Sequence, residues 1–240
     1  MSEGIEGDKM KEKIKIYHGS QLVIERPIYG TGNPKNDYGM GFYCTCEIEL
    51  AKEWACTEEN SGYVNQYEVD LSELSVINLS GMEYSILNWL AILLNNRSFR
   101  ISNEIAIEGK QYLLEKFLPD TKEADAIIGY RADDSYFSFA NAFLNNTISL
   151  TQLERAMYLG KLGEQTMIKS KTAFERMQFV CSEVADRNIY YPKRSARDRE
   201  ARMIYRRGID TENAANSIYL IDILREGWES DDIRIRRNIP

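Results

Sequence analysis

Two segments near the start of the chain combine residue types that suit the binding of a flat, positively charged ring. Residues 17–20 read Tyr-His-Gly-Ser, and residues 37–45 read Asp-Tyr-Gly-Met-Gly-Phe-Tyr-Cys-Thr before Ala-Lys-Glu-Trp at 51–54. The electron-rich faces of Tyr43 and Trp54 attract a planar cation by stacking and cation–π attraction, worth roughly 0.5–2 kcal/mol per face. These aromatic side chains therefore indicate a site for such a ring.

Gly19 offers a second kind of recognition. A carboxamide needs one acceptor and one donor at fixed geometry, and the backbone C=O and N–H of one glycine supply both because no side chain blocks the approach. The neighbouring His18 is the only histidine of the chain. A Ser-His-Asp triad or Cys-His dyad that does not use His18 is excluded, and we expect no metal site.

The order of these motifs resembles the signature of ADP-ribosyltransferases of the diphtheria-toxin and poly-ADP-ribose-polymerase branch. The longer motifs also resemble a bacterial family of the domain-of-unknown-function 3990 type. The resemblance implies NAD as substrate, with nicotinamide stacked between Tyr43 and Trp54, which stand 11 residues apart. It further implies that Gly19 binds the carboxamide, that Ser20 adds a hydroxyl to it, and that His18 binds the adenosine ribose.

Each motif also has a purely structural interpretation. His-Gly-Ser alone is a weak tripeptide, and Gly-x-Gly-Phe-Tyr at 39–43 fits a glycine-punctuated strand. Trp54 stands at helical spacing from Leu50 and fits a core position. The three motifs in this order and spacing favour the functional interpretation.

A late strand of the resembling family carries a catalytic carboxylate that binds the ribose 2′-OH and stabilises an oxocarbenium-like state. Residues 164–168, Glu-Gln-Thr-Met-Ile, match that strand best. If Met167 points inward, Gln165 shares its face by the period of two and Glu164 points away. We therefore assign Gln165 to the catalytic position, with Glu164 as the alternative; glutamine offers no full negative charge, which favours transfer of a single ADP-ribose over polymer elongation.

A polar cluster follows a short apolar segment at 126–128. Its residues are Arg131, Asp133 and Asp134. One of the aspartates could supply the missing negative charge, and Arg131 could bind a phosphate or an acidic target. The structural alternative is that Asp134 or Ser135 caps the following helix.

The window 193–207 carries seven basic residues against two acidic ones. Such a stripe suits a nucleic acid or an acidic partner. We favour a solvated amphipathic helix in which Met203, Ile204 and Tyr205 are partly buried, because the whole chain is acidic, with a net charge of −7.

The composition is typical of a soluble globular protein, with 43% hydrophobic and 28% charged residues. The four cysteines form neither a dense disulfide framework nor a CxxC pair, so we expect them to be reduced. The longest apolar run, residues 89–94, is too short to span a bilayer, and the first residues lack an apolar signal region. These features predict a cytoplasmic protein without a membrane partner.

The apolar pattern predicts an α+β fold. We expect strands at 13–17, 42–44, 63–71, 76–79, 126–128, 165–169 and 178–181. We expect a first helix that ends at Cys56 with Thr45 as its N-cap, and further helices at 84–95 and 103–117. A fourth helix is expected to end at residue 145, a fifth to run from a Ser149/Gln152 capping box to about residue 160, and a sixth to begin at about residue 196. The resemblance implies a split mixed or antiparallel sheet with flanking helices. We divide the chain into a flexible N-terminus (1–12), an ADP-ribosyltransferase-like domain (13–182) and a C-terminal helical segment packed on that domain (183–240).

The resemblance implies a mono-ADP-ribosyltransferase that releases nicotinamide from NAD and transfers ADP-ribose to a macromolecular acceptor, a protein or a nucleic acid. Bacterial proteins of this type often act as toxins that a partner antitoxin neutralises. Two alternatives stay open: a catalytically silent NAD- or ADP-ribose-binding module, and an RNA 2′-phosphotransferase-like enzyme, which would need several inward arginines.

Overall fold

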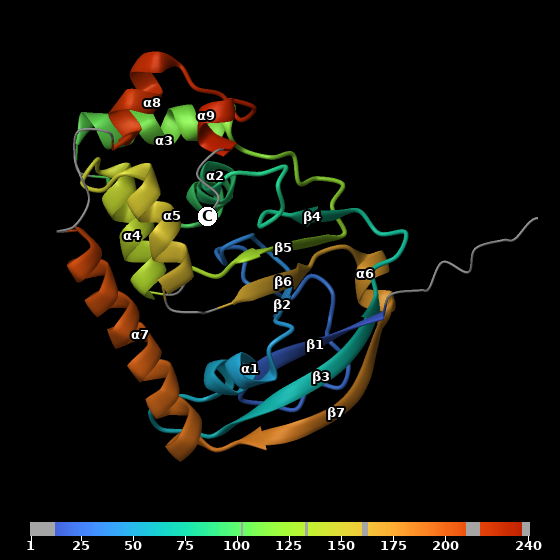
Figure 1. The fold of residues 1–240 in the computed structure, drawn as a ribbon. Helices are drawn as coiled ribbons and strands as arrows, with labels where there is room; N and C mark the ends of the chain where they lie inside the picture. The colour runs from blue at the N-terminus through green and yellow to red at the C-terminus, as the bar shows by residue number, and fades with distance from the viewer. Residues whose placement is uncertain (1–12, 102, 133, 160–162, 210–216, 237–240) are drawn as a thin grey trace, which may run out of the picture.

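The computed structural model describes residues 13–101, 103–132, 134–159, 163–209 and 217–236. Its fold is α+β, as the sequence predicts, and the strands form two sheets (Figure 1). Sheet A is antiparallel and has the order β1-β3-β7, with bounds Lys13–Ser20, Gly62–Asp70 and Met177–Ala185. Sheet B has the order β2-β6-β5-β4, with bounds Phe42–Cys44, Glu164–Ile168, Ala126–Tyr130 and Val76–Asn78. Only the β4–β5 pair of sheet B is parallel, so the expected split sheet is confirmed.

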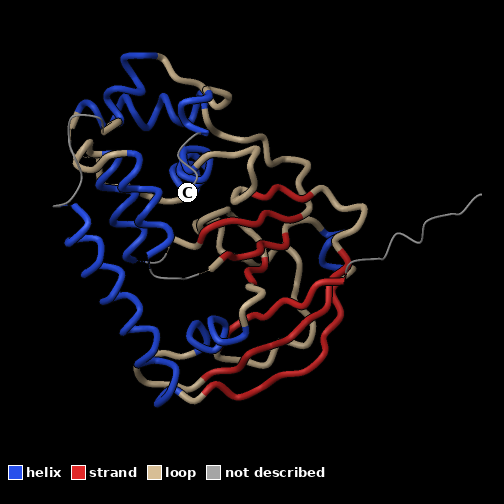
Figure 2. The backbone as a smooth tube through the Cα atoms, viewed as in Figure 1, coloured by secondary structure: helices blue, strands red, loops and turns tan. Residues whose placement is uncertain are grey.

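The helices lie mainly on the side of sheet B away from sheet A (Figure 2). They are α1 Ile48–Ala55, α2 Ile86–Asn96, α3 Glu104–Lys116, α4 Asp134–Leu144, α5 Leu150–Leu159, α6 Lys171–Glu175, α7 Arg187–Ile209, α8 Leu220–Glu226 and α9 Ile233–Arg236. Helix α1 packs on sheet A, and the long α7 runs from α1 to α4 and α5 along one side of the molecule (Figure 1). The bidentate pair between Arg197 and the buried carboxylate of Glu53 ties α7 to α1.

Two apolar layers hold sheet B between them. On one face, β2, β5 and β6 pack against α2, whose residues from Ile86 to Leu94 are all buried. On the other face, Cys44 and Ile168 pack with Ile16 and Tyr67 of sheet A. Because both faces of β6 are covered, its residues 165–168 are all buried.

The two sheets meet where β1 passes β2. Tyr17 N–H donates to Thr45 O at 2.8 Å, and Thr45 N–H donates back to Tyr17 O at 3.0 Å. Two residues further along β1, Gly19 lies directly against α1, where a Cβ atom would come 2.1 Å from Ala51 O and 2.7 Å from Ala55 N. Glycine is therefore required at 19 for the close approach of strand and helix, whatever else its backbone does.

Local predictions fared differently. The capping box is confirmed, because Gln152 N–H donates to Ser149 Oγ at 3.1 Å and Ser149 N–H donates to Gln152 Oε1 at 2.8 Å. Thr45 as N-cap was wrong: Thr45 pairs with Tyr17, its hydroxyl accepts from Glu47 N–H, and Glu47 is the N-cap.

The basic helix begins at Arg187, well before the expected 196. The helix is preceded by Asp186, whose carboxylate accepts from Asn188 N–H. Past Pro192, Lys193 donates to Glu49 of α1 and Arg194 donates to Cys56 O just after α1. The predicted flexible segment 1–12 lies outside the described residues. In the part of the chain that the structure describes, no helix has the length and apolar character needed to span a membrane.

Candidate functional site

Tyr43 and Gln165 lie on the same face of sheet B. Tyr43 pairs with Met167 across the β2–β6 ladder, so Gln165 is its diagonal neighbour, about 7–8 Å away. Gln165 is 3% exposed, and its neighbour Glu164 is exposed on the opposite face. Burial, and next the charge of Glu164, raise the pKa of the Cys46 thiol. The orientation of Gln165 inward and Glu164 outward agrees with the period-of-two prediction.

Asp37 is the closest charged group to Gln165. Its carboxylate is buried, and Oδ2 accepts from Gln165 Nε2 at 3.0 Å and from Ala132 N–H at 2.9 Å. Oδ1 accepts from Arg97 Nη1 at 2.6 Å. Gln165 Nε2 also donates to Tyr130 O at 3.3 Å. The amide of Gln165 is thus held between a carboxylate and a backbone carbonyl.

Sequence reasoning missed this cluster. Asp37 lies at the start of the motif at residues 37–45, and its separation of 128 residues from Gln165 gives no sequence signal that the two meet. Arg97 follows α2 as an isolated basic residue, which carries no signal at all. The clue that the sequence offers is an acidic residue beside an aromatic residue in a glycine-rich segment.

His18 is anchored by its ring. Nδ1 lies 2.6 Å from Tyr43 O, and the ring stacks on Phe42 with centroids 4.2 Å apart. Because a carbonyl oxygen only accepts, Nδ1 carries the proton and Nε2 of the neutral ring is an acceptor. Burial lowers the pKa of His18, more than the bond to Tyr43 O raises it, so the ring is neutral at pH 7.

A cavity of about 420 Å³ opens beside His18. Phe42 and Tyr43 of β2 line it, together with Phe174 and residues of the loop between β1 and β2. Arg26 of this loop lines the cavity and has no acidic partner among the residues that the structure describes. The cavity joins a neutral hydrogen-bonding ring, aromatic surface and one cationic side chain, which suits an aromatic ligand with an anionic group.

The phenol of Tyr43 is fixed to the same loop. Its hydroxyl donates to Gly39 O at 2.7 Å and accepts from Tyr38 N–H at 3.0 Å. The Tyr38 ring lies nearly parallel to it, with centroids 6.4 Å apart. Burial raises the pKa of Tyr43 far above its ordinary value, so the phenol is a permanent donor.

Trp54 lies on α1 with Arg131 against its ring, the guanidinium carbon 4.3 Å from the ring centroid. Its indole Nε1 is buried and has no hydrogen-bond partner among the described residues. A buried donor without an acceptor costs about 1–3 kcal/mol, which makes it a feature that a ligand acceptor would relieve. The face of Trp54 already accommodates a planar cation, as expected of an electron-rich ring.

The other predicted residues are placed as follows. Ser20 Oγ donates to Leu22 O at 2.5 Å, so its hydroxyl is used within its own loop. Asp133 lies outside the described residues, and Asp134 begins α4 with a side chain that is not described. Arg131 directly precedes Ala132, whose N–H is bound by Asp37.

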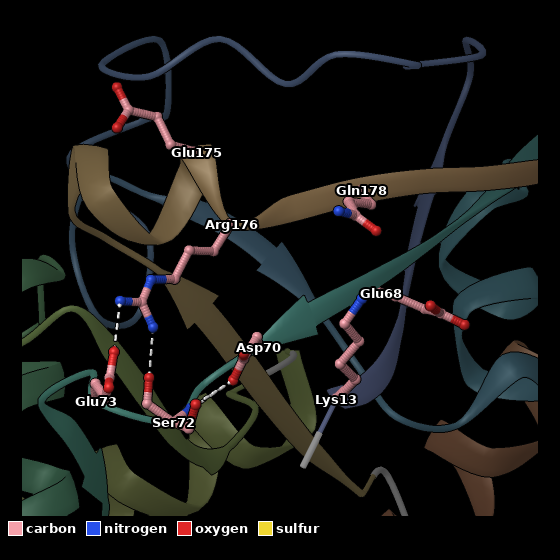
Figure 3. A pocket seen from close by; sticks show the side chains of 8 residues that line it. All are labelled: Lys13, Glu68, Asp70, Ser72, Glu73, Glu175, Arg176 and Gln178. Carbon is pink, nitrogen blue, oxygen red and sulfur yellow. Dashed lines mark hydrogen bonds and ion pairs between the residues drawn. The ribbon is translucent and has the colours of Figure 1, made fainter. Parts of the chain in front are cut away.

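A separate cavity of about 380 Å³ lies at the far end of sheet A and holds none of the predicted residues. Figure 3 shows Arg176 reaching Glu73 and the backbone of Ser72, with Asp70 bound to Ser72 beside it. The acidic residues of this cavity therefore lie near Arg176, whose guanidinium is already bound to Glu73 and Ser72. Within the described ranges, no group of three His, Cys, Asp or Glu side chains could hold a metal ion.

Comparison with protein families places these features in a known group of sequences. Residues 14–179 match the family described as protein of unknown function (DUF3990), which covers most of the chain and includes β1 to the start of β7. The chain belongs to this family. Comparisons with curated proteins and with solved structures found no match.

Proposed function

We propose that the protein is an NAD-dependent mono-ADP-ribosyltransferase. The observation that carries the proposal is the meeting of β1, β2 and β6, which places the His18 ring against the Tyr43 carbonyl and Gln165 diagonal to Tyr43 across the β2–β6 ladder. His18 and Tyr43 both line the cavity of about 420 Å³. His18 and Tyr43 have the residue types that the sequence resemblance assigns to ribose and nicotinamide, and Gln165 stands where the resembling family carries its carboxylate. Trp54 supports the assignment with an unpartnered buried N–H and a face that already holds a planar cation.

In the proposed reaction, the bond between ribose C1′ and the nicotinamide nitrogen breaks and its electron pair stays on that nitrogen, which gives neutral nicotinamide. C1′ becomes oxocarbenium-like, and an oxygen, nitrogen or sulfur atom of the acceptor forms the new bond and releases its proton. Gln165 would bind the 2′-OH through Oε1, and stacking on Tyr43 and Trp54 would hold the leaving ring. Arg26 would face the diphosphate. A cytoplasmic address, a macromolecular acceptor and an antitoxin partner belong to the same proposal.

A silent NAD- or ADP-ribose-binding module is the second candidate, because residue 165 is an uncharged glutamine with its amide already bound to Asp37. Release of nicotinamide from NAD by the purified protein separates the two. Gln165→Ala should lower turnover by about tenfold to a thousandfold, as expected for loss of a group that acts in the transition state.

Glu164→Ala is the matched control, since its exposed side chain lies on the other face of the same strand. It should leave turnover within about twofold. NAD binding without nicotinamide release would support the silent module. Absence of NAD binding would refute both candidates.

A further inference from the structure

Asp37 connects four separate parts of the fold at one carboxylate. It lies in the loop before β2, and its side chain is 7% exposed. Arg97 after α2 donates to Oδ1, while Ala132 after β5 and Gln165 of β6 donate to Oδ2. The Asp37 backbone oxygen also accepts from Asn96 Nδ2 at 3.1 Å. All these bonds converge where the proposed catalytic position lies.

The two neighbours of Gln165 Nε2 dictate which way its amide points. The Asp37 carboxylate and the Tyr130 carbonyl can only accept, so the NH₂ group must face them and cannot be exchanged with the oxygen. A flipped amide would bring an oxygen against two oxygens. The carbonyl Oε1 must therefore point the other way.

The side-chain oxygen Oε1 of Gln165 is an acceptor without a donor among the described residues. Within the described residues, the fully buried side-chain atoms without a partner are Trp54 Nε1, Ser80 Oγ, Glu154 Oε2 and Ser182 Oγ. Oε1 of Gln165 is not among them, and no described group donates to it. Gln165 Oε1 therefore has no hydrogen-bond donor within the described residues and is not fully buried, as expected of an atom that accepts from a ligand hydroxyl.

We propose that Asp37 is a positioning residue that orients the amide of Gln165, so that Oε1 is the acceptor presented to the 2′-OH of the reacting ribose. This inference rests on the proposed function. Arg97 balances the charge of Asp37 at 2.6 Å, so the carboxylate acts through Gln165 and not as a free charge at the sugar. The site thus presents an oriented amide dipole in place of the carboxylate that the resembling family uses.

Asp37→Asn tests the orientation because it replaces one oxygen by NH₂ at nearly constant volume. Arg97 retains the remaining oxygen, since a guanidinium needs an acceptor, and the new NH₂ then faces Gln165. The new NH₂ opposes two donors, Gln165 Nε2 and Ala132 N–H, while the Tyr130 carbonyl disfavours a complete turn of the Gln165 amide, so Oε1 is no longer held toward the ribose. Turnover for nicotinamide release should fall by about tenfold to a hundredfold, while NAD affinity changes by less than about threefold.

The reciprocal exchange provides the rescue. Gln165→Glu alone brings two carboxylates together and should disrupt the cluster. When Asp37→Asn and Gln165→Glu are combined, the introduced amide donates to the introduced carboxylate, which restores the hydrogen bond between residues 37 and 165 in the opposite direction and leaves a carboxylate oxygen facing the sugar, although Ala132 N–H still lacks its acceptor. Turnover of this double variant should exceed that of either single variant by about tenfold or more. Asp231→Asn, on an exposed aspartate far along the chain, controls for the loss of one charge.

A readout without NAD completes the test. The side-chain NH₂ protons of Gln165, identified by NMR as those missing in Gln165→Leu, should exchange slowly in the wild type and rapidly in Asp37→Asn. Rapid exchange in the wild type, or a double variant no more active than Gln165→Glu, would overturn the inference even if Asp37→Asn failed to fold. A wild type that releases no nicotinamide refutes the proposed function instead, and the exchange measurement still decides the orientation of the amide.

Discussion

Tyr43 has two separable tasks, and Tyr43→Phe removes only one of them. The substitution keeps the ring that would stack on nicotinamide but removes the hydroxyl that donates to Gly39 O and accepts from Tyr38 N–H. Two hydrogen bonds are lost, and the Tyr38 N–H loses the partner that the structure gives it. We expect the free energy of unfolding to fall by about 1–3 kcal/mol. For a chain of this length that is a decrease in Tm of roughly 3–10 °C.

Thermal unfolding followed by circular dichroism, together with calorimetric titration of NAD, measures both tasks. Tyr43→Phe should bind NAD within about threefold of wild type, whereas Tyr43→Ala should lose about tenfold or more because one stacking face is gone. Tyr29→Phe is the matched control, since Tyr29 lies in the same loop but is 54% exposed; its Tm should not change. The reasoning is refuted if Tyr43→Phe keeps full stability, or if it loses as much NAD affinity as Tyr43→Ala.

Two pH dependences follow from buried groups. Burial lowers the pKa of His18, so NAD affinity should be constant from pH 8 to about 6.5 and should weaken only below that range, as the ring acquires its charge; His18→Asn should show no such decline, and equal pH profiles would contradict the assignment. Burial raises the pKa of Glu154 from 4.5 to about 7, so its contribution to stability is complete below about pH 4.5 and is lost as pH rises through about 7. Urea unfolding at pH 8 should therefore find Glu154→Gln more stable than wild type by about 1–2 kcal/mol, allowing for solvent screening of the partly exposed side chain. Parallel stability profiles of the two proteins from pH 5 to 8 would exclude that shift.

The parts of the fold that follow from local patterns could be predicted from the sequence. Ser149 and Gln152 predict a helix start, because in a capping box each of the two side chains accepts a hydrogen bond from the backbone N–H of the other residue. The inward orientation of Gln165 follows from the strand period and an apolar neighbour at 167.

Features set by distant contacts could not be predicted in this way. Thr45 has the residue type of an N-cap but is bound by Tyr17 of β1 instead. The early start of α7 depends on contacts with α1, and Asp37 acquires its role only when the loop, α2, β5 and β6 come together. These contacts join segments that are far apart in the sequence, and local sequence patterns do not indicate which distant segments pack together.

The most direct measurement of the central claim is a crystal structure of the protein with an NAD analogue whose bond between nicotinamide and ribose cannot be cleaved. We expect the nicotinamide ring between Tyr43 and Trp54, the adenosine ribose at His18, and the 2′-OH of the reacting ribose within hydrogen-bond distance of Gln165 Oε1. An analogue bound elsewhere on the chain, or one whose reacting ribose lies against Glu164, would contradict the account.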